Sequence, residues 1–249
     1  MKSYYRYIAN ADQLPSARMY DFLLERYVKD DPQVTIADVG CENGHGIKLI
    51  RDQRPRGKVV AIDKRDQRSD KNSEFIIADL SQTLPDAIPK FDYVFCLEVF
   101  EHIEKQYEEL VLSNLRSLLR PSGRLFLSTP IKQYWNVLHF PTKDHVNEVE
   151  YSYLSSLLRR YFDIEESFVV RKRPRSYYLR YLNTPVNVLS VGLFNFPSIL
   201  VNRLQRSGLV PKEMALEYFD RQVSIAEDPE AVGSVQLHVL AAKSNPGME

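Results

Sequence analysis

The sequence predicts an α/β fold in which helices flank a mostly parallel β-sheet. Three observations support it. A short run of β-forming residues, 34–39, leads directly into a glycine-rich turn and a helix. Two further apolar runs, 58–63 and 74–80, each carry an acidic residue at or beside the last position. The run 91–97 is almost continuously apolar, which is typical of a strand buried on both faces in the middle of a parallel sheet.

Length and charge limit the class of protein. The 249 residues suit one large α/β domain, or a core with a subdomain, and can bury a substantial core. The 33 basic and 33 acidic residues give a net charge of zero, so nucleic acid is not an expected partner. Both cysteines lie in apolar runs and are interpreted as reduced thiols, which indicates the cytoplasm. The first seven residues show no apolar signal segment or cleavage site.

The residues 35–46 form the central motif of the chain. Gly40 and Gly44 tolerate backbone angles that a Cβ would forbid, and they allow the main chain to approach a ligand closely. The helix expected to begin near His45 would direct its free N–H groups at the turn. This is the arrangement of a Rossmann-like first βα unit. The spacing, D-x-G-x-x-x-G-x-G from Asp38, differs from the dinucleotide pattern G-x-G-x-x-G.

The other elements follow from the same periodicity. A tyrosine-rich arm, 1–13, precedes an amphipathic helix expected over 15–29. The strand 58–63 ends in Asp63, which lies 19 residues after Gly44. A carboxylate there can accept hydrogen bonds from both ribose hydroxyls of a nucleoside, as in the related dinucleotide fold. Beyond residue 97 the pattern predicts helices over 104–119 and 148–161, and strands over 124–129 and 162–170.

Two stretches together resemble a known family. The motif that starts at Asp38 resembles the first motif of class I S-adenosylmethionine (SAM)-dependent methyltransferases, usually written D-x-G-x-G-x-G. Glu42 stands where that motif has its middle glycine. The run FDYVFCLEVFEHI, residues 91–103, resembles the segment after the fourth strand in members that act on small molecules. In fold and motifs together, the chain is similar to quinone-biosynthesis O-methyltransferases. The resemblance covers roughly residues 34–170.

The resemblance implies a fold, a cofactor and a set of binding residues. It implies a seven-stranded sheet whose last strand, antiparallel to the others, falls at 234–242. SAM would lie across the C-terminal ends of the first, second and fourth strands. The Asp79 carboxylate would accept a hydrogen bond from the adenine amino group. It can also be interpreted as a turn cap beside Ser81. The implied cofactor-binding residues are Asp38, Gly40, Cys41, Gly44, Asp63, Asp79, Leu80, Leu97 and Glu98.

A long insertion separates the last two expected strands. Residues 171–210 contain seven arginines and lysines before the acidic stretch 211–230 begins, and no charge falls between Tyr181 and Asn202. Prolines and asparagines in that uncharged stretch argue against a transmembrane helix. We expect a helical lid over the acceptor or a homodimer surface, because a structureless loop of this length is unusual. The predicted organisation is arm and helix at 1–33, SAM-binding core at 34–170, insertion at 171–232, and last strand and tail at 233–249.

The expected reaction is methyl transfer to a small-molecule hydroxyl. In-line displacement mainly requires that the acceptor be held close and aligned, and a base beside a hydroxyl helps. His102, just past the fourth expected strand, is the first candidate, and His145 is the second; His139 lies in the same loop as His145. A capping or packing role at a helix start is the other interpretation of His102.

Two alternatives remain open, while the main prediction assigns no metal. Glu98, Glu101 and His102 would share one face of a helix, and with His145 they form a donor set for a divalent ion. That set, with Glu148 three residues later, resembles metal-dependent RNA 3′-terminal 2′-O-methyltransferases. The second alternative is a catalytically inactive methyltransferase-like scaffold, in which the side chain at position 42 closes the cofactor site.

Overall fold

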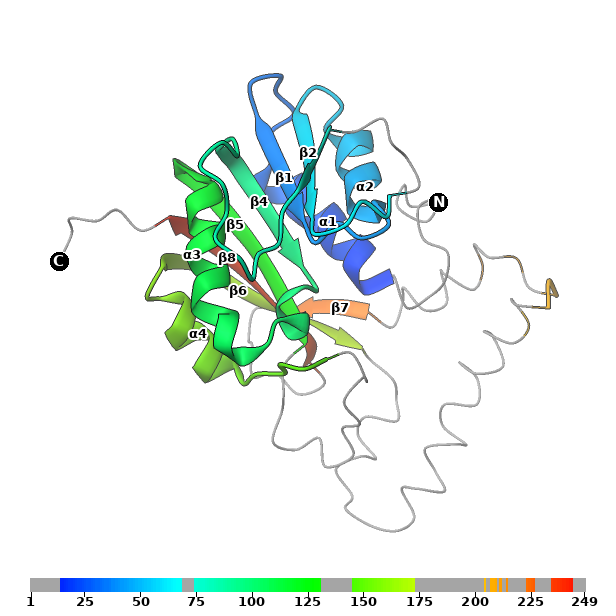
Figure 1. Ribbon diagram of the computed structural model, residues 1–249. Helices are drawn as coiled ribbons and strands as arrows, with labels where there is room; N and C mark the ends of the chain where they lie inside the picture. Colours follow the sequence, from blue (N-terminus) through cyan, green and yellow to red (C-terminus); the bar gives the residue numbers. More distant parts are fainter. Residues whose placement is uncertain are drawn as a thin grey trace, which may run out of the picture.

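A computed structural model shows an α/β molecule built around one twisted sheet (Figure 1). It describes residues 14–68, 74–130, 145–172, 223–226 and 234–243, together with positions 204, 207–209, 211 and 214. The described elements, in chain order, are α1 (Leu14–Tyr27), β1 (Thr35–Val39), α2 (His45–Gln53), β2 (Lys58–Asp63), β3 (Glu74–Ile77), β4 (Phe91–Leu97), the short 3₁₀ helices η3 (Phe100–His102) and η4 (Lys105–Tyr107), α3 (Glu108–Leu118), β5 (Leu119–Pro130), α4 (Tyr151–Leu158), β6 (Phe162–Lys172), β7 (Val223–Ala226) and β8 (Ser234–Lys243).

The sheet confirms the predicted α/β class and its strand directions. Its order is β3-β2-β1-β4-β5-β8-β6-β7. The strands β1 to β5 pair in parallel, and β8 is antiparallel to both β5 and β6. Seven of these strands form the expected mixed sheet with its antiparallel last strand. In the described part of the chain β7 adds an eighth, short strand at the edge, antiparallel to β6.

Both faces of the sheet are buried, which explains the continuous apolar runs in the central strands. Successive residues of β4 alternate between two cores: Val94 and Cys96 join one, while Phe95 and Leu97 join the other. The first core packs under α3 and α4, and the second packs under α1 and α2 (Figure 1). Burying both faces favours an unbroken apolar strand over an alternating one.

Several predicted boundaries shift, each for a local reason. The third strand ends at Ile77 rather than residue 80, because Asp79 accepts hydrogen bonds from the backbone N–H and hydroxyl of Ser81 and starts a turn. The helix expected at 104–119 begins as the 3₁₀ turn η4 and becomes α-helical only at Glu108. The fifth strand starts earlier than expected, since Leu119 already pairs with Phe91 before a register shift.

Some predictions fall outside the described residues. The N-terminal arm, His139 and most of the insertion, with its proposed helical lid or dimer surface, belong to this group. None of the helices in the described part of the chain is both long enough and apolar enough to span a membrane.

Candidate active site

A cavity of about 600 Å³ opens where the parallel strands β1, β2 and β4 end and where β3 leads into its turn. The strand order reverses between β1 and β4 at this edge, which is where open α/β sheets bind their ligands. Five of the predicted cofactor residues line it: Gly40, Asp63, Asp79, Leu80 and Glu98. The lining residues that sequence reasoning did not single out for this site include Lys64, Arg65, Gln67, Ala78, Val99 and Ile103.

In the turn after β1, the backbone of Gly40 lies close to the side chain of Val99. Gly40 has a φ of 70°, and a Cβ added there would lie 2.4 Å from Cγ2 of Val99. Only glycine fits without displacing Val99 or straining the backbone. The N–H of Gly40 donates to the carbonyl of Ile62 at 2.8 Å, which ties the turn to the end of β2.

Glu42, at the position of the motif's middle glycine, has a left-handed backbone. Its φ is 43°, in the left-handed region, and its side chain is exposed at the edge of the cavity. Its backbone N–H donates to Oδ2 of Asp63 at 3.0 Å. The departure from the family motif therefore leaves the cavity open, and the backbone bears the strain of a non-glycine residue in this region.

The two strand-end acids occupy different local settings. The Asp63 carboxylate accepts backbone hydrogen bonds from Glu42 and from Arg65, at 3.0 and 3.2 Å, so it is fixed between two loops. Asp79 accepts both bonds from Ser81 through one oxygen, Oδ1, at 2.9 and 2.7 Å. The bond from the Ser81 hydroxyl is the main reason that the pKa of Asp79 lies below its usual value. Asp79 is thus a turn cap and a wall of the cavity at once.

Asp38 lies behind the glycine turn rather than in the cavity wall. It is 1% exposed, and the Tyr20 hydroxyl donates to its Oδ1 at 2.6 Å. Its Oδ2 has no hydrogen-bond partner among the described residues. Burial raises the pKa of Asp38 to about 7, against the lowering effect of Tyr20. The predicted residues that do not line the cavity are Asp38, Cys41, Gly44 and Leu97.

The segment after β4 is not the single helix that the i, i+3, i+4 spacing assumed. Glu98 has a φ of 58°, which breaks the helix before η3 begins at Phe100. The N–H of Glu98 donates to Ser128, and the Ser128 hydroxyl donates to Oε1 of Glu98 at 2.6 Å. Glu98 and Glu101 consequently do not share the helix face that their spacing assumed.

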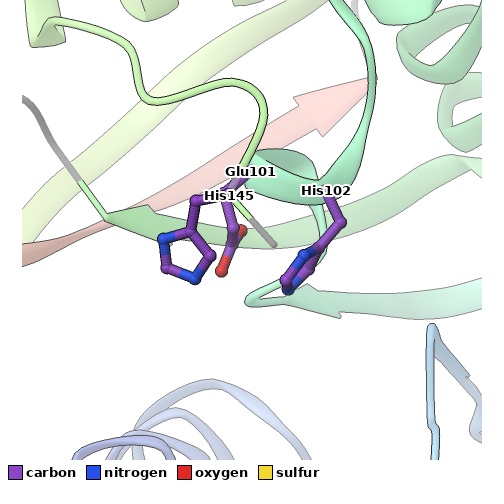
Figure 2. A group of neighbouring side chains, drawn as sticks. All are labelled: Glu101, His102 and His145. Carbon is purple, nitrogen blue, oxygen red and sulfur yellow. The ribbon is translucent and has the colours of Figure 1, made fainter. Parts of the chain in front are cut away.

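Three of the four predicted donors, Glu101, His102 and His145, do come together at this point. Figure 2 shows the Glu101 carboxylate between the rings of His102 and His145. The two ring centroids are 5.2 Å apart. Glu101 is 1% exposed, and burial, followed by the charge of Glu98, raises its pKa to about 9. His102 lines the cavity, so this cluster adjoins the cofactor region.

The match of this chain to known proteins agrees with the fold and the cavity. The chain belongs to the methyltransferase domain family, whose model matches residues 10–166. Its domain is of the class I SAM-dependent methyltransferase type, and SAM is the cofactor of that family. It is 30% identical over 122 residues to the mitochondrial ubiquinone biosynthesis O-methyltransferase of Saccharomyces cerevisiae (strain ATCC 204508 / S288c), across 43% of this chain and 36% of that protein. The chain spans less than half the length of the curated relatives it matches.

Solved structures with the same fold are more distant in sequence. A SAM-dependent methyltransferase from Archaeoglobus fulgidus has a TM-score of 0.55 and 15% identity, with 91% of this chain and 94% of that chain covered. Coclaurine N-methyltransferase, bound to N-methylheliamine and S-adenosylhomocysteine, has a TM-score of 0.52 and 17% identity, with 91% and 72% covered. By name these relatives include an O- and an N-methyltransferase, so the acceptor must be argued from the side chains of this chain.

Proposed function

We propose that this enzyme methylates a hydroxyl group of a small-molecule acceptor. The observation that carries the proposal is the position of His102, an exposed imidazole on the cavity wall with His145 and Glu101 beside it. SAM supplies a methyl group on a positively charged sulfur, so the protein needs mainly to align the acceptor and assist the loss of its proton. Imidazole is the side chain best suited to such proton transfer near neutral pH.

The cofactor would be held by the side chains that end the strands. Asp63, already fixed between two loops, would accept hydrogen bonds from the ribose hydroxyls. Asp79 still has its second oxygen to offer the adenine amino group, and the buried Leu80 would pack on the base. Gly40 would allow the main chain to approach the methionine part.

The other predicted cofactor residues would act at the edges of this site. Glu98 would line the methyl-donor side, and Leu97, which is buried in the core and does not line the cavity, would pack behind it. The buried Asp38 would shape the loop that carries Cys41 and Gly44. Its Oδ2 would reach the amino group of the methionine part of SAM only in a conformation in which this turn opens.

The catalytic assignment predicts a selective loss of turnover. His102→Gln should lower kcat on a hydroxyl acceptor by about 100-fold or more and leave the affinity for S-adenosylhomocysteine little changed. The control is Glu109→Gln on α3, which removes an exposed carboxylate that pairs with Arg160 and does not line the cavity. Turnover of the His102 variant equal to that of the control would remove this imidazole from the mechanism.

The two alternative functions are affected differently by the structure. The exposed side chain of Glu42 and the open cavity weigh against an inactive scaffold in which that residue closes the site. The cluster of Glu101, His102 and His145 supports one part of the RNA methyltransferase alternative, the divalent ion, while the net charge of zero does not favour a polyanionic acceptor. We therefore propose a small molecule as the acceptor, and the cytoplasm as the location because both cysteines are buried free thiols.

A further inference from the structure

The turn between β1 and α2 contains a chemically labile pair of residues, Asn43 and Gly44. It is the only Asn-Gly pair in the sequence. The backbone nitrogen that follows an asparagine can attack the carbon of the side-chain amide, and glycine hinders this attack least because it has no Cβ. Asn43 is exposed, so water can reach the amide. The asparagine with the most reactive neighbour therefore lies in the turn that carries the cofactor motif.

Two hydrogen bonds hold this turn closed. The N–H of Gly44 donates to the carbonyl of Cys41 at 2.7 Å, and the N–H of His45 donates to Oδ1 of Asn43 at 3.0 Å. The second bond polarises the amide carbonyl that would be attacked, but the first holds the proton that the attacking nitrogen must lose. The closed turn thus protects Asn43, and the attack requires that the turn open first.

The closed form of the turn is weakly held. Glu42, directly before Asn43, has a left-handed φ of 43°, which strains the backbone of a residue with a Cβ. The hydrogen bond from His45 to the Asn43 side chain is exposed, so water can replace it with little loss of free energy. Opening the turn relieves the strain at Glu42 and frees the nitrogen of Gly44 for the attack.

We propose that Asn43 is a site of spontaneous deamidation, by which the turn is inactivated when no cofactor is bound. The nitrogen of Gly44 bonds to Cγ of Asn43 while its proton passes to solvent, and the side-chain nitrogen leaves as ammonia. The resulting cyclic succinimide takes up one water molecule at either of its two carbonyl groups. The products are an aspartate or an isoaspartate at position 43, and no oxidant or reductant is required.

The two products affect the turn differently. Aspartate keeps the course of the main chain and adds one negative charge at an exposed position that does not line the cavity. Isoaspartate leads the main chain through the former side chain, which inserts one methylene group before Gly44. Its N–H then loses its alignment with the Cys41 carbonyl, and the start of α2 shifts. The isoaspartate form should bind the cofactor more weakly, and this consequence rests on the proposed function, in which this turn approaches SAM.

A bound cofactor should protect the turn from this reaction. A ligand that binds only the closed turn lowers the population of the open, reactive form by mass action. The rate of deamidation should fall by the factor 1 + [ligand]/Kd, which is about 100-fold at a ligand concentration 100 times Kd. Enzyme that holds cofactor is then preserved, while enzyme without cofactor gradually loses its binding site.

The test follows the mass of one peptide. The full chain is incubated in mildly alkaline buffer at physiological temperature, with and without S-adenosylhomocysteine, and then digested with trypsin. Cleavage after Lys29 and Lys48 releases residues 30–48, in which Asn43 is the only asparagine. Deamidation replaces an amino group by a hydroxyl group in this peptide, and synthetic peptides identify the aspartate and isoaspartate forms by their elution. An unincubated sample gives the background.

We expect both products in the protein without ligand and a slower reaction with S-adenosylhomocysteine. Asn43→Gln should remain unmodified, because its longer side chain closes the corresponding ring far more slowly. The buried Asn114 and Asn147, each followed by a bulky residue, are internal controls that should also remain unmodified. No mass change at position 43 above the background would overturn the proposal and leave the proposed function standing. An equal rate with bound S-adenosylhomocysteine would overturn the protection by the closed turn.

The effect of the modification on the cofactor site is measured by calorimetry. The isoaspartate form, separated by ion exchange, should bind S-adenosylhomocysteine at least about tenfold more weakly than the unmodified chain, as expected when a hydrogen bond of the turn is lost. The matched control is Asn43→Asp, which has the charge without the additional methylene group and should bind as the unmodified chain does. Equal binding by the isoaspartate form would overturn the inactivation. Failure of the fresh, unmodified chain to bind would contradict the proposed function instead, while the mass change would still decide whether Asn43 reacts.

Discussion

At the scale of single residues, the buried pair of Asp38 and Tyr20 links the first motif to stability. The Asp38 carboxyl sits under the glycine turn with a pKa raised by burial to about 7, while an unfolded chain has it at 3.8. At a pH between these two pKa values, the folded protein binds one proton more than the unfolded chain does. The Asp38 carboxyl therefore lowers the free energy of unfolding progressively as pH rises from about 4 to 7. We expect the free energy of unfolding of the unmodified chain to fall relative to Asp38→Asn by about 2 kcal/mol between pH 5 and pH 7.

Denaturant unfolding of both proteins across this pH range measures the difference. Tyr20→Phe provides a second check. The Tyr20 hydrogen bond lowers the pKa of Asp38, so its loss should raise that pKa and extend the fall in the free energy of unfolding to higher pH. A stability difference between the unmodified chain and Asp38→Asn that stays constant from pH 5 to pH 8 would mean that Asp38 is not protonated in the folded state at neutral pH.

At the scale of elements, the turn between β1 and α2 carries a strain that can be measured. Glu42 has a φ of 43°, and only its backbone N–H is bonded to Asp63. Glu42→Gly should relieve the strain of the left-handed backbone and keep the hydrogen bond from the backbone N–H of residue 42 to Asp63. Glu42→Ala also removes the side chain beyond Cβ, but it keeps the strain. We expect the glycine variant to be more stable than the alanine variant by about 1 kcal/mol, the strain relief being reduced by the larger entropy of glycine in the unfolded chain.

Thermal or denaturant unfolding of the two variants, without cofactor, checks this prediction. An alanine variant as stable as the glycine variant would mean that position 42 is not held in the left-handed region.

The strands of the core could be predicted from the sequence because their signals are local. The runs 58–63 and 91–97 match β2 and β4 residue for residue, since apolar strands bounded by turns leave a continuous pattern. The left-handed Glu98 could not be predicted, because a glutamate gives no local indication of a positive φ. The edge strand β7 was missed since it is four residues long and is defined by its pairing with β6, far away in the sequence.

The site shows the same division between local and long-range information. Gly40, Asp63, Asp79, Leu80 and Glu98 reach the cavity because strand ends of a parallel sheet meet at one edge, and a strand end can be recognised in the sequence. The approach of His145 to Glu101 depends on a buried asparagine and on two backbone hydrogen bonds, donated to Glu101 from residues 45 and 46 positions further along the chain. No periodicity in the sequence indicates such a contact.

At the scale of the whole molecule, one edge of the sheet brings together the cofactor cavity and the histidine cluster. The ends of β1, β2 and β4 line the cavity, and the cluster comes from η3, which follows β4, and from the loop before α4. We propose that the cavity binds the nucleoside part of SAM through Asp63, whatever the acceptor is.

The most direct test is calorimetric titration of S-adenosylhomocysteine into the unmodified chain and into Asp63→Asn, both in EDTA. Asparagine keeps the shape of the aspartate side chain, but its single carbonyl oxygen can accept only one of the two backbone bonds, because Glu42 and Arg65 donate to different oxygens of Asp63. A cooperative thermal transition of the variant therefore has to verify that its fold is intact. We predict micromolar binding to the unmodified chain and binding at least roughly tenfold weaker to the variant, because hydrogen bonds to a charged acceptor contribute about 1.5–3 kcal/mol. No binding to the unmodified chain, or equal binding to both, would contradict the account.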